Sequence, residues 1–283
     1  MLKTVIKRNG TREEAQPAKL NGWSEWSSAQ FGAYIDWTDI AMAAAKELPE
    51  ECHTRDLMNA LIKECLGRNT YYHNRMAGRL YAATIHKDLY GVTLHKDKDK
   101  GKMPTVQEVH QSLYDVGYMR KLDYSDADYA EINTLIKHRR DFTYAHFQLH
   151  HIRYKYALRN RINGTELESP QFVFMRMAMA LAETQPRNRR MEDVKHMYEL
   201  FSRNVINAPT PNYVNLGTHL NGYASCCLYT THDTAHSLAV GDHIGYMMTV
   251  QSAGIGNILQ TRSIGDAVRG GLIKHQGKQL PLY

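Results

Sequence analysis

The sequence predicts an α/β protein whose first two thirds are mainly helical and whose last part mixes short strands with turns. Three observations support this prediction. The chain starts with a β-prone run and a turn signal, continues through apolar stripes at helical spacing, and changes near residue 206 to short β-prone runs with glycines. Its 283 residues are enough for more than one core. We therefore expect three parts, residues 1–94, 95–205 and 206–283.

The first part should open with a hairpin and continue as helices. Thr4-Val5-Ile6-Lys7 is β-prone, and Asn9-Gly10 is the strongest short hairpin signal. A helix should begin near Thr54, a plausible N-cap, since an apolar stripe follows it. That stripe consists of Leu57, Met58, Leu61, Ile62 and Cys65. The next helix should end near Tyr90-Gly91, because glycine often ends helices; it carries Leu80, Ala83, Thr84 and Leu89.

The middle part should be helical on both sides of a turn. The charged stretch His95 to Lys102 predicts an exposed connection, and Asn163-Gly164 marks a turn. Ser169-Pro170 predicts a helix start. The helix behind it carries a methionine stripe that indicates core packing rather than a binding surface. The stripe and its neighbours are Phe172, Val173, Met175, Met177, Met179, Ala180 and Leu181, and a further helix carries Val194, Met197, Tyr198 and Phe201.

Charge and cysteine content restrict the possible partners. The net charge of +6 suits anions, either nucleotides or nucleic acid. Basic clusters at 137–140, 153–161 and 187–190 are interpreted as solvated faces, with nucleic-acid binding as a weaker alternative. Four cysteines indicate no disulfide framework, and no spacing indicates a metal site. Neither a membrane span nor a signal peptide is predicted, so we expect a cytoplasmic protein.

The last part contains the residues with the most suggestive chemistry. Pro209-Thr210-Pro211 is a rigid turn that could present a hydroxyl to an anion, although a structural turn is the simpler interpretation. Cys226 follows Ser225, and it is either inert or paired with a thiol of another polypeptide.

Further along, Ala253-Gly254-Ile255-Gly256 permits a ligand to approach the backbone. Asp233, Arg262 and Arg269 could bind a sugar hydroxyl and phosphates, or could be ordinary surface charges. At the other end of the chain, a second group could gather around a triphosphate: Lys7, Arg8, Lys19, Thr54 and Lys87.

In order, these segments resemble the large, catalytic subunit of aerobic (class I) ribonucleotide reductase, of the bacterial and phage type. The resemblance is specific in five segments and looser at the N-terminus, where Val5 to Gly10 is similar to the start of the family's ATP-cone. The five segments are Glu168-Ser169-Pro170-Gln171-Phe172, Pro209-Thr210-Pro211, Ser225-Cys226, Ala253-Gly254-Ile255-Gly256 and Arg269-Gly270-Gly271.

The resemblance implies a fold and a reaction. The implied fold is an α-rich ATP-cone-like module and a helical region, followed by the first part of a ten-stranded α/β barrel. The implied reaction is the reduction of ribonucleoside diphosphates to deoxyribonucleoside diphosphates. A metal-containing small subunit generates a thiyl radical, which removes the 3′ hydrogen, and a cysteine pair then supplies electrons and ends as a disulfide. No metal is implied for this chain.

The resemblance also assigns residues. Cys226 matches the first cysteine of the reducing pair, and three positions match the substrate site: Thr210, Ser225 and Gly254. The allosteric specificity site, which takes a deoxynucleoside triphosphate, is matched by Asp233, Arg262 and Arg269, and the helix after Asp233 would pack against its twin in a dimer. The overall-activity ATP site is matched by Lys7, Glu13, Lys19, Thr54 and Lys87. Met58 and Thr84 depart from the histidines common in related cones, which leaves a cone without strong nucleotide binding as an alternative.

Parts of the family's machinery have no counterpart in this sequence. These are the radical cysteine, the second reducing cysteine, the radical-relay tyrosines and the C-terminal dithiol tail. We therefore expect a second polypeptide to complete the large subunit, together with the small subunit and a thioredoxin- or glutaredoxin-type reductant. The alternatives are a degenerate truncated product and a regulatory nucleotide-binding protein without catalysis.

Overall fold

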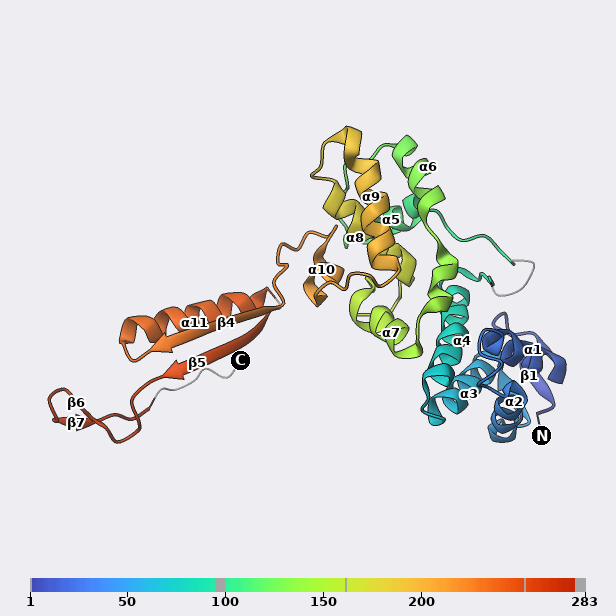
Figure 1. Ribbon diagram of the computed structural model, residues 1–283, viewed down its shortest axis with the longest axis horizontal. Coiled ribbons are helices and arrows are strands. Elements are labelled where there is room, and N and C mark those ends of the chain that lie inside the picture. Colours follow the sequence, from blue (N-terminus) through green and yellow to red (C-terminus); the bar gives the residue numbers. More distant parts are fainter. Residues whose placement is uncertain (1, 95–99, 161, 252, 278–283) are drawn as a thin grey trace. The chain divides into compact units, whose positions relative to one another are not determined.

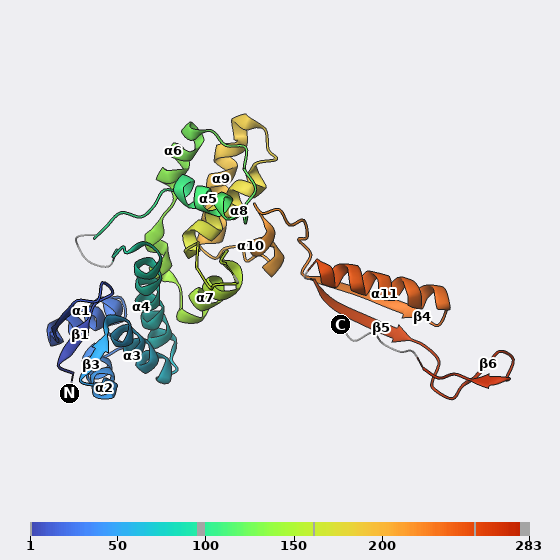
Figure 2. The same cartoon turned by 180° about the vertical axis from the view of Figure 1, so that it is seen from behind.

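The computed structural model describes residues 2–94, 100–160, 162–251 and 253–277. The chain divides into two compact units, residues 1–207 and 208–283. We describe each unit by itself (Figures 1 and 2). The structure is a mixture of helices and strands in which helices predominate, as the sequence predicted.

The first unit begins with a small three-stranded sheet. Strand β1 (Thr4–Ile6) lies in the middle, antiparallel to β2 (Arg12–Glu14) and parallel to β3 (Glu51–His53). The predicted hairpin is thus confirmed, and Gly10 has the positive φ, 81°, that its turn requires. Helices α1 (Pro17–Ser28) and α2 (Trp37–Glu47) connect β2 to β3.

Two helices complete this N-terminal region. Helix α3 (Thr54–Gly67) packs against α4 (Tyr71–Tyr90), the longest helix of the described chain. The predicted N-cap at Thr54 is wrong by one residue. His53 is the N-cap, because β3 continues to that residue and the Asp56 carboxylate accepts its amide at 2.9 Å. Helix α4 ends as predicted, at Gly91 with a left-handed φ of 67°.

The rest of the first unit is helical. Helices α5 (Val106–Asp115) and α6 (Asp126–Leu135) both begin with capping boxes, at Thr105 and Ser125. The short 3₁₀ helix η1 (His138–Thr143) precedes α7 (His146–His151), which continues directly into the π-helical turn η2 (Ile152–Tyr156). Helices α8 (Pro170–Ala182) and α9 (Arg187–Ser202) pack side by side. Part of the predicted connection, residues 95–99, lies outside the described residues.

The core of the first unit is built around α8. Every residue of this helix except Leu181 is buried, including all three of its methionines. The methionine stripe is therefore core packing, as predicted. The buried side of α3 largely matches the prediction: Met58, Leu61, Ile62 and Cys65 are buried, while Leu57 is half-buried. Among the described helices, none combines the length and the apolar character that crossing a lipid bilayer requires.

The second unit contains one strand–helix–strand motif. After α10 (Thr210–Asn215), strand β4 (Cys226–His232) leads into α11 (Ala235–Val250) and then into β5 (Gly254–Gln260). The two strands are parallel over seven residue pairs, and α11 covers them (Figure 1). A small hairpin, β6 (Ala267–Val268) and β7 (Ile273–Lys274), follows.

Candidate functional site

The second unit brings Cys226, Ser225 and Gly254 together where its two parallel strands begin. Cys226 is directly opposite Gly254 in the register, and the Gly254 amide donates to the Ser225 carbonyl at 2.8 Å. The Cys226 residue is exposed and its thiol is free. Because position 254 has no side chain, a ligand can approach both the backbone and the sulfur from this side.

Thr210 lies apart from this group in the described contacts. It is the first residue of α10, is exposed, and follows Pro209 at the N-cap. The loop expected around Pro209-Thr210-Pro211 is thus the start of a short helix. Within the described residues of this unit, no hydrogen bond joins Thr210 to Cys226, Ser225 or Gly254. The structure therefore assembles three of the four residues assigned to the thiol and the substrate site.

Two of the three residues assigned to the specificity site form an ion pair. Arg262 donates through Nε to Asp233 Oδ2 at 2.5 Å, joining the end of β5 to the turn before α11. Arg269 lies in the turn of the β6–β7 hairpin, is exposed and has a φ of 52°. Among the described interactions, none links Arg269 to the Asp233–Arg262 pair.

In the first unit, Glu13 joins the two lysines predicted at the ATP site. Its carboxylate pairs with Lys19 at 2.8 Å and with Lys7 at 2.6 Å. Hydrogen bonds from Lys19 and then Lys7 lower the pKa of this half-buried carboxyl. Thr54 belongs to the same end of the sheet, since Ile6 is paired with His53 and the next residues are Lys7 and Thr54.

Lys87 lies on α4 beside these cations. It is half-buried and forms no ion pair with any described residue. Its pKa is lowered, first by burial and then by the positive charges of Arg8, Lys100 and Lys7. A bound anion would relieve this mutual repulsion. The described contacts thus join Lys7, Glu13 and Lys19, and Lys87 is close enough to Lys7 for the two charges to repel each other.

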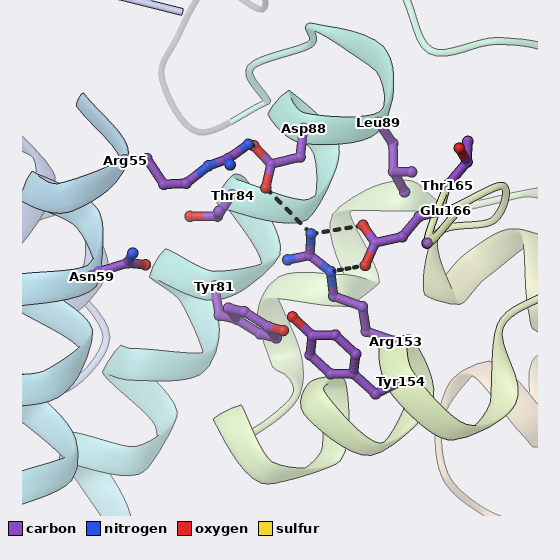
Figure 3. Close-up of a pocket in the computed structure, with 11 residues that line it drawn as sticks. Arg55, Asn59, Tyr81, Thr84, Asp88, Leu89, Arg153, Tyr154, Thr165 and Glu166 are labelled. Carbon is purple, nitrogen blue, oxygen red and sulfur yellow. Dashed lines mark hydrogen bonds and ion pairs between the residues drawn. The ribbon is translucent and has the colours of Figure 1, made fainter. Parts of the chain in front are cut away.

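A cavity of about 550 Å³ opens beside this region, between α3, α4 and η2 (Figure 3). At its edge, Asp88 Oδ1 accepts from Arg8 Nη2 at 2.6 Å and from Arg55 Nη2 at 3.0 Å, and Asp88 Oδ2 accepts from Arg153 Nη2 at 3.3 Å. Arg153 also donates twice to Glu166, at 2.7 Å each. We call Arg8, Arg55, Asp88, Arg153 and Glu166 the Asp88 junction.

The sequence patterns had singled out only Arg8 from the Asp88 junction. Its partners lie far apart in the chain, and Arg153 had been grouped with the basic cluster at 153–161. The available signals were indirect. Asp88 adjoins Lys87, and Arg153 belongs to a π-helical turn, a feature that is frequent at functional sites.

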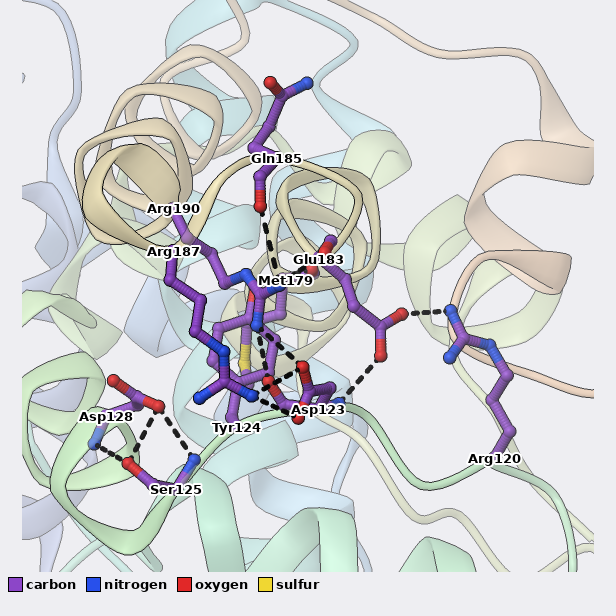
Figure 4. Close-up of polar contacts among 10 residues, drawn as sticks. All are labelled: Arg120, Asp123, Tyr124, Ser125, Asp128, Met179, Glu183, Gln185, Arg187 and Arg190. Carbon is purple, nitrogen blue, oxygen red and sulfur yellow. Dashed lines mark hydrogen bonds and ion pairs between the residues drawn. The ribbon is translucent and has the colours of Figure 1, made fainter.

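The basic clusters are largely occupied by contacts within the fold. Arg140 pairs with Glu199 at 2.6 Å. Arg187 and Arg190 both pair with Asp123, at 3.0 and 3.2 Å (Figure 4). Arg120 forms an ion pair with Glu183 in the same region. These arginines mainly hold helices and loops together, which weakens the nucleic-acid interpretation. In the described part of the chain, no three His, Cys, Asp or Glu side chains are grouped closely enough to hold a metal ion.

Comparison with known proteins first identifies the class. Residues 142–221 match the family model of the ribonucleotide reductase all-alpha domain, a segment that runs from η1 through α9 and α10. This part of the chain is therefore similar to ribonucleotide reductases, in agreement with the resemblance seen in its motifs.

The curated relatives show which subunit the chain is similar to. The chain is 26% identical to ribonucleoside-diphosphate reductase 1 subunit alpha of Escherichia coli and 25% identical to subunit alpha of Haemophilus influenzae, covering 99% of this chain in both cases. It is also 25% identical to subunit alpha of Enterobacteria phage T4, over 96% of this chain. The chain spans 36% of the length of each of these relatives. Over nearly its whole length the chain is thus similar to part of a reductase alpha subunit.

Proposed function

We propose that this chain contributes the N-terminal part of the large subunit of a ribonucleoside-diphosphate reductase, which makes deoxyribonucleotides for DNA synthesis. The observation that supports this most directly is the free, exposed Cys226 opposite Gly254, beside Ser225. A reducing thiol must be accessible, and a diphosphate or ribose needs a bare backbone to approach. These three residues meet both requirements, and Thr210 would contribute a hydroxyl from α10 when substrate is bound.

In the proposed reaction Cys226 is one of two thiols that are oxidised. The pair loses two electrons and two protons and becomes a disulfide, while the ribose loses its hydroxyl as water. The radical that starts the reaction would come from a metal-containing small subunit, and a thioredoxin- or glutaredoxin-type protein would reduce the disulfide. We propose that further polypeptide supplies the second thiol, the radical cysteine and the other strands of a ten-stranded barrel.

Two regions of the chain are proposed to bind effectors. The Lys7, Glu13, Lys19, Thr54 and Lys87 region would take ATP or dATP as an ATP-cone does, since its cations lie together near a helix start. Asp233 and Arg262, with Arg269 nearby in sequence, would take a deoxynucleoside triphosphate. Helix α11 would then pack against its twin in a dimer, because it leaves Tyr246, Met247 and Val250 exposed.

Substitution of the thiol tests the catalytic proposal. Cys226→Ser in the assembly of this chain with the completing polypeptide and the small subunit should abolish nearly all turnover, while Cys227→Ser should retain it. Both variants should keep the thermal stabilisation given by deoxynucleoside triphosphates, about 2.7 kcal/mol at a hundredfold excess over Kd. Turnover that survives Cys226→Ser contradicts the catalytic role.

A second candidate is a nucleotide-binding regulatory protein without catalysis. This candidate is favoured because the five residues of the proposed ATP site all lie within residues 1–207, whereas Cys226 belongs to the other unit. Nucleotide-induced stabilisation combined with turnover that is indifferent to Cys226→Ser would support this candidate. Co-purification with a polypeptide that completes the barrel would support the enzyme instead.

A further inference from the structure

The Asp88 junction links two parts of the first unit that are far apart in sequence. Arg8 comes from the turn of the N-terminal hairpin. Arg55 comes from the first turn of α3, and Arg153 belongs to the π-helical turn η2 (Figure 3). All three guanidinium groups share one carboxylate, whose side chain is only 11% exposed. The junction therefore connects the region of Lys7, Glu13, Lys19, Thr54 and Lys87, which we call the lysine-rich region, to the helices that follow it.

The three contacts of Asp88 are unequal. The contact with Arg8 is the shortest, at 2.6 Å, and the contact with Arg153 is the longest, at 3.3 Å. Burial alone would raise the pKa of Asp88, but hydrogen bonds from Arg8 and Arg55 outweigh burial and lower it. Asp88 is thus a charged group for which several cations compete, and the loss of one partner should strengthen its attraction to the others.

Arg8 has a second potential partner. It is the neighbour of Lys7 in the chain, and its charge is one of those that depress the pKa of Lys87. A triphosphate placed among Lys7, Lys19 and Lys87 would lie within reach of Arg8 and would attract it with several negative charges. Arg8 would then have to leave Asp88, at least in part.

Arg153 is positioned to respond to such a change. It is fixed at one side by two hydrogen bonds with Glu166, and its guanidinium lies over the rings of Tyr81 and Tyr154, at 5.4 and 5.7 Å. The buried Tyr81 hydroxyl faces Tyr154 without a well-directed hydrogen bond to any described residue. The adjacent cavity of about 550 Å³ leaves room for these groups to rearrange.

We propose that Asp88 is a positioning residue that couples phosphate binding at the lysine-rich region to the π-helical turn, by exchanging Arg8 for Arg153 as its main partner. This inference rests on the proposed nucleotide site and adds a route by which its occupancy reaches the helical region. Since coupling works in both directions, a change that weakens the contact between Arg153 and Asp88 should also change the affinity for the nucleotide.

The coupling predicts opposite effects for two substitutions. Asp88→Asn removes the competitor for Arg8, so ATP should bind roughly fivefold or more tightly. Arg153→Gln leaves Asp88 with Arg8 as its dominant partner, so ATP should bind more weakly. The double variant should behave like Asp88→Asn, because Arg153 can influence Arg8 only by competing for the Asp88 carboxylate.

The experiment measures the Kd of ATP by calorimetry for the full chain and these three variants. Asp39→Asn, which removes a surface ion pair with Arg68, is the matched control and should leave Kd unchanged. Hydrogen–deuterium exchange of residues 152–156 should change when ATP is added to the unmodified chain, and should not change in Asp88→Asn.

The outcomes distinguish a failure of the proposed nucleotide site from a failure of the coupling. If ATP does not bind the unmodified chain, the proposed nucleotide site fails and the coupling fails with it. If ATP binds but both single variants leave Kd unchanged, or both weaken it equally as a purely structural role would, the coupling alone is overturned. If Asp88→Asn folds poorly, two results still test the coupling. They are the weaker ATP binding of Arg153→Gln, and the change in hydrogen–deuterium exchange of residues 152–156 when ATP is added to the unmodified chain.

Discussion

Gly254 lies directly opposite Cys226 in the parallel ladder of β4 and β5. A methyl group at position 254 would come within 3.3 Å of the Ser225 carbonyl and 3.7 Å of the Cys226 sulfur. The first distance is tight and the second is ordinary contact, so the backbone can keep its path. The methyl group would, however, partly cover the side from which a reagent or substrate reaches the sulfur.

Gly254→Ala should therefore slow the chemistry at Cys226 while leaving the fold nearly intact. We expect alkylation of Cys226 to slow severalfold and the free energy of unfolding to change by less than about 1 kcal/mol. Gly256→Ala is the control, since its methyl would meet only the mobile end of Leu228, at 2.6 Å, and not the thiol. Mass spectrometry after timed iodoacetamide treatment measures the rate, and equal rates in the two variants would contradict the prediction.

The four cysteines should differ sharply in reactivity. Cys52 and Cys65 are buried, and burial raises the pKa of both thiols, that of Cys65 to about 12. Cys226 is exposed and Cys227 is partly so. Treatment of the native chain with a thiol reagent at pH 8 should therefore modify Cys226 first and leave Cys52 and Cys65 unmodified until the protein unfolds. Early modification of Cys65 would show that α3 does not pack as described.

The ion pair between Glu168 and Arg176 should be the most sensitive polar contact of the first unit. Both side chains are fully buried, and Arg176 donates to Glu168 at 2.7 and 3.1 Å. Glu168→Gln keeps the shape but leaves the guanidinium without its counter-charge, which should lower the free energy of unfolding by about 3–5 kcal/mol. Glu50→Gln, which removes an exposed pair with Lys3, should cost less than about 1 kcal/mol. Urea denaturation of both variants measures the difference.

The sequence predicted those elements whose signals are local. Asn9-Gly10, Ser169-Pro170 and Gly91 set the hairpin and two helix ends through their own backbone preferences, and helical spacing predicted which side of α3 is buried. The N-cap of α3 was misplaced because β3, a strand of three residues, gave no signal.

The candidate sites were predicted only in part, again because the sequence shows local signals and not contacts between distant residues. Cys226 and Gly254 were identified by motif, and their pairing follows from the parallel register. The Asp88 junction was largely missed, because Asp88 meets residues that are 80, 33 and 65 positions away. No local sequence pattern predicts such contacts, because they depend on how α3, α4 and η2 pack.

Buried histidines should make the first unit sensitive to mild acid. His110 is fully buried, and burial, with a further contribution from the charge of Arg176, lowers its pKa from 6.5 to about 3. The folded state therefore keeps His110 neutral at pH 5, whereas the unfolded chain binds a proton there. Since the unfolded state gains protons between pH 6.5 and 3, the contribution of this residue to stability is complete above pH 6.5 and declines as the pH falls.

Replacement of His110 should reduce that decline. Between pH 7 and pH 5 the unmodified chain should lose about 2 kcal/mol through His110 alone. His110→Gln removes the titrating group and keeps a polar side chain beside the Tyr129 hydroxyl, which now lies 3.1 Å from His110 Nδ1. The free energy of unfolding of this variant, measured in urea at both pH values, should fall by about 2 kcal/mol less than that of the unmodified chain. His196→Gln, at an exposed position of α9, should follow the unmodified chain. If the His110 variant shows the same dependence on pH as that control, His110 is not held neutral by burial, and the packing of α5 against α8 must be looser than described.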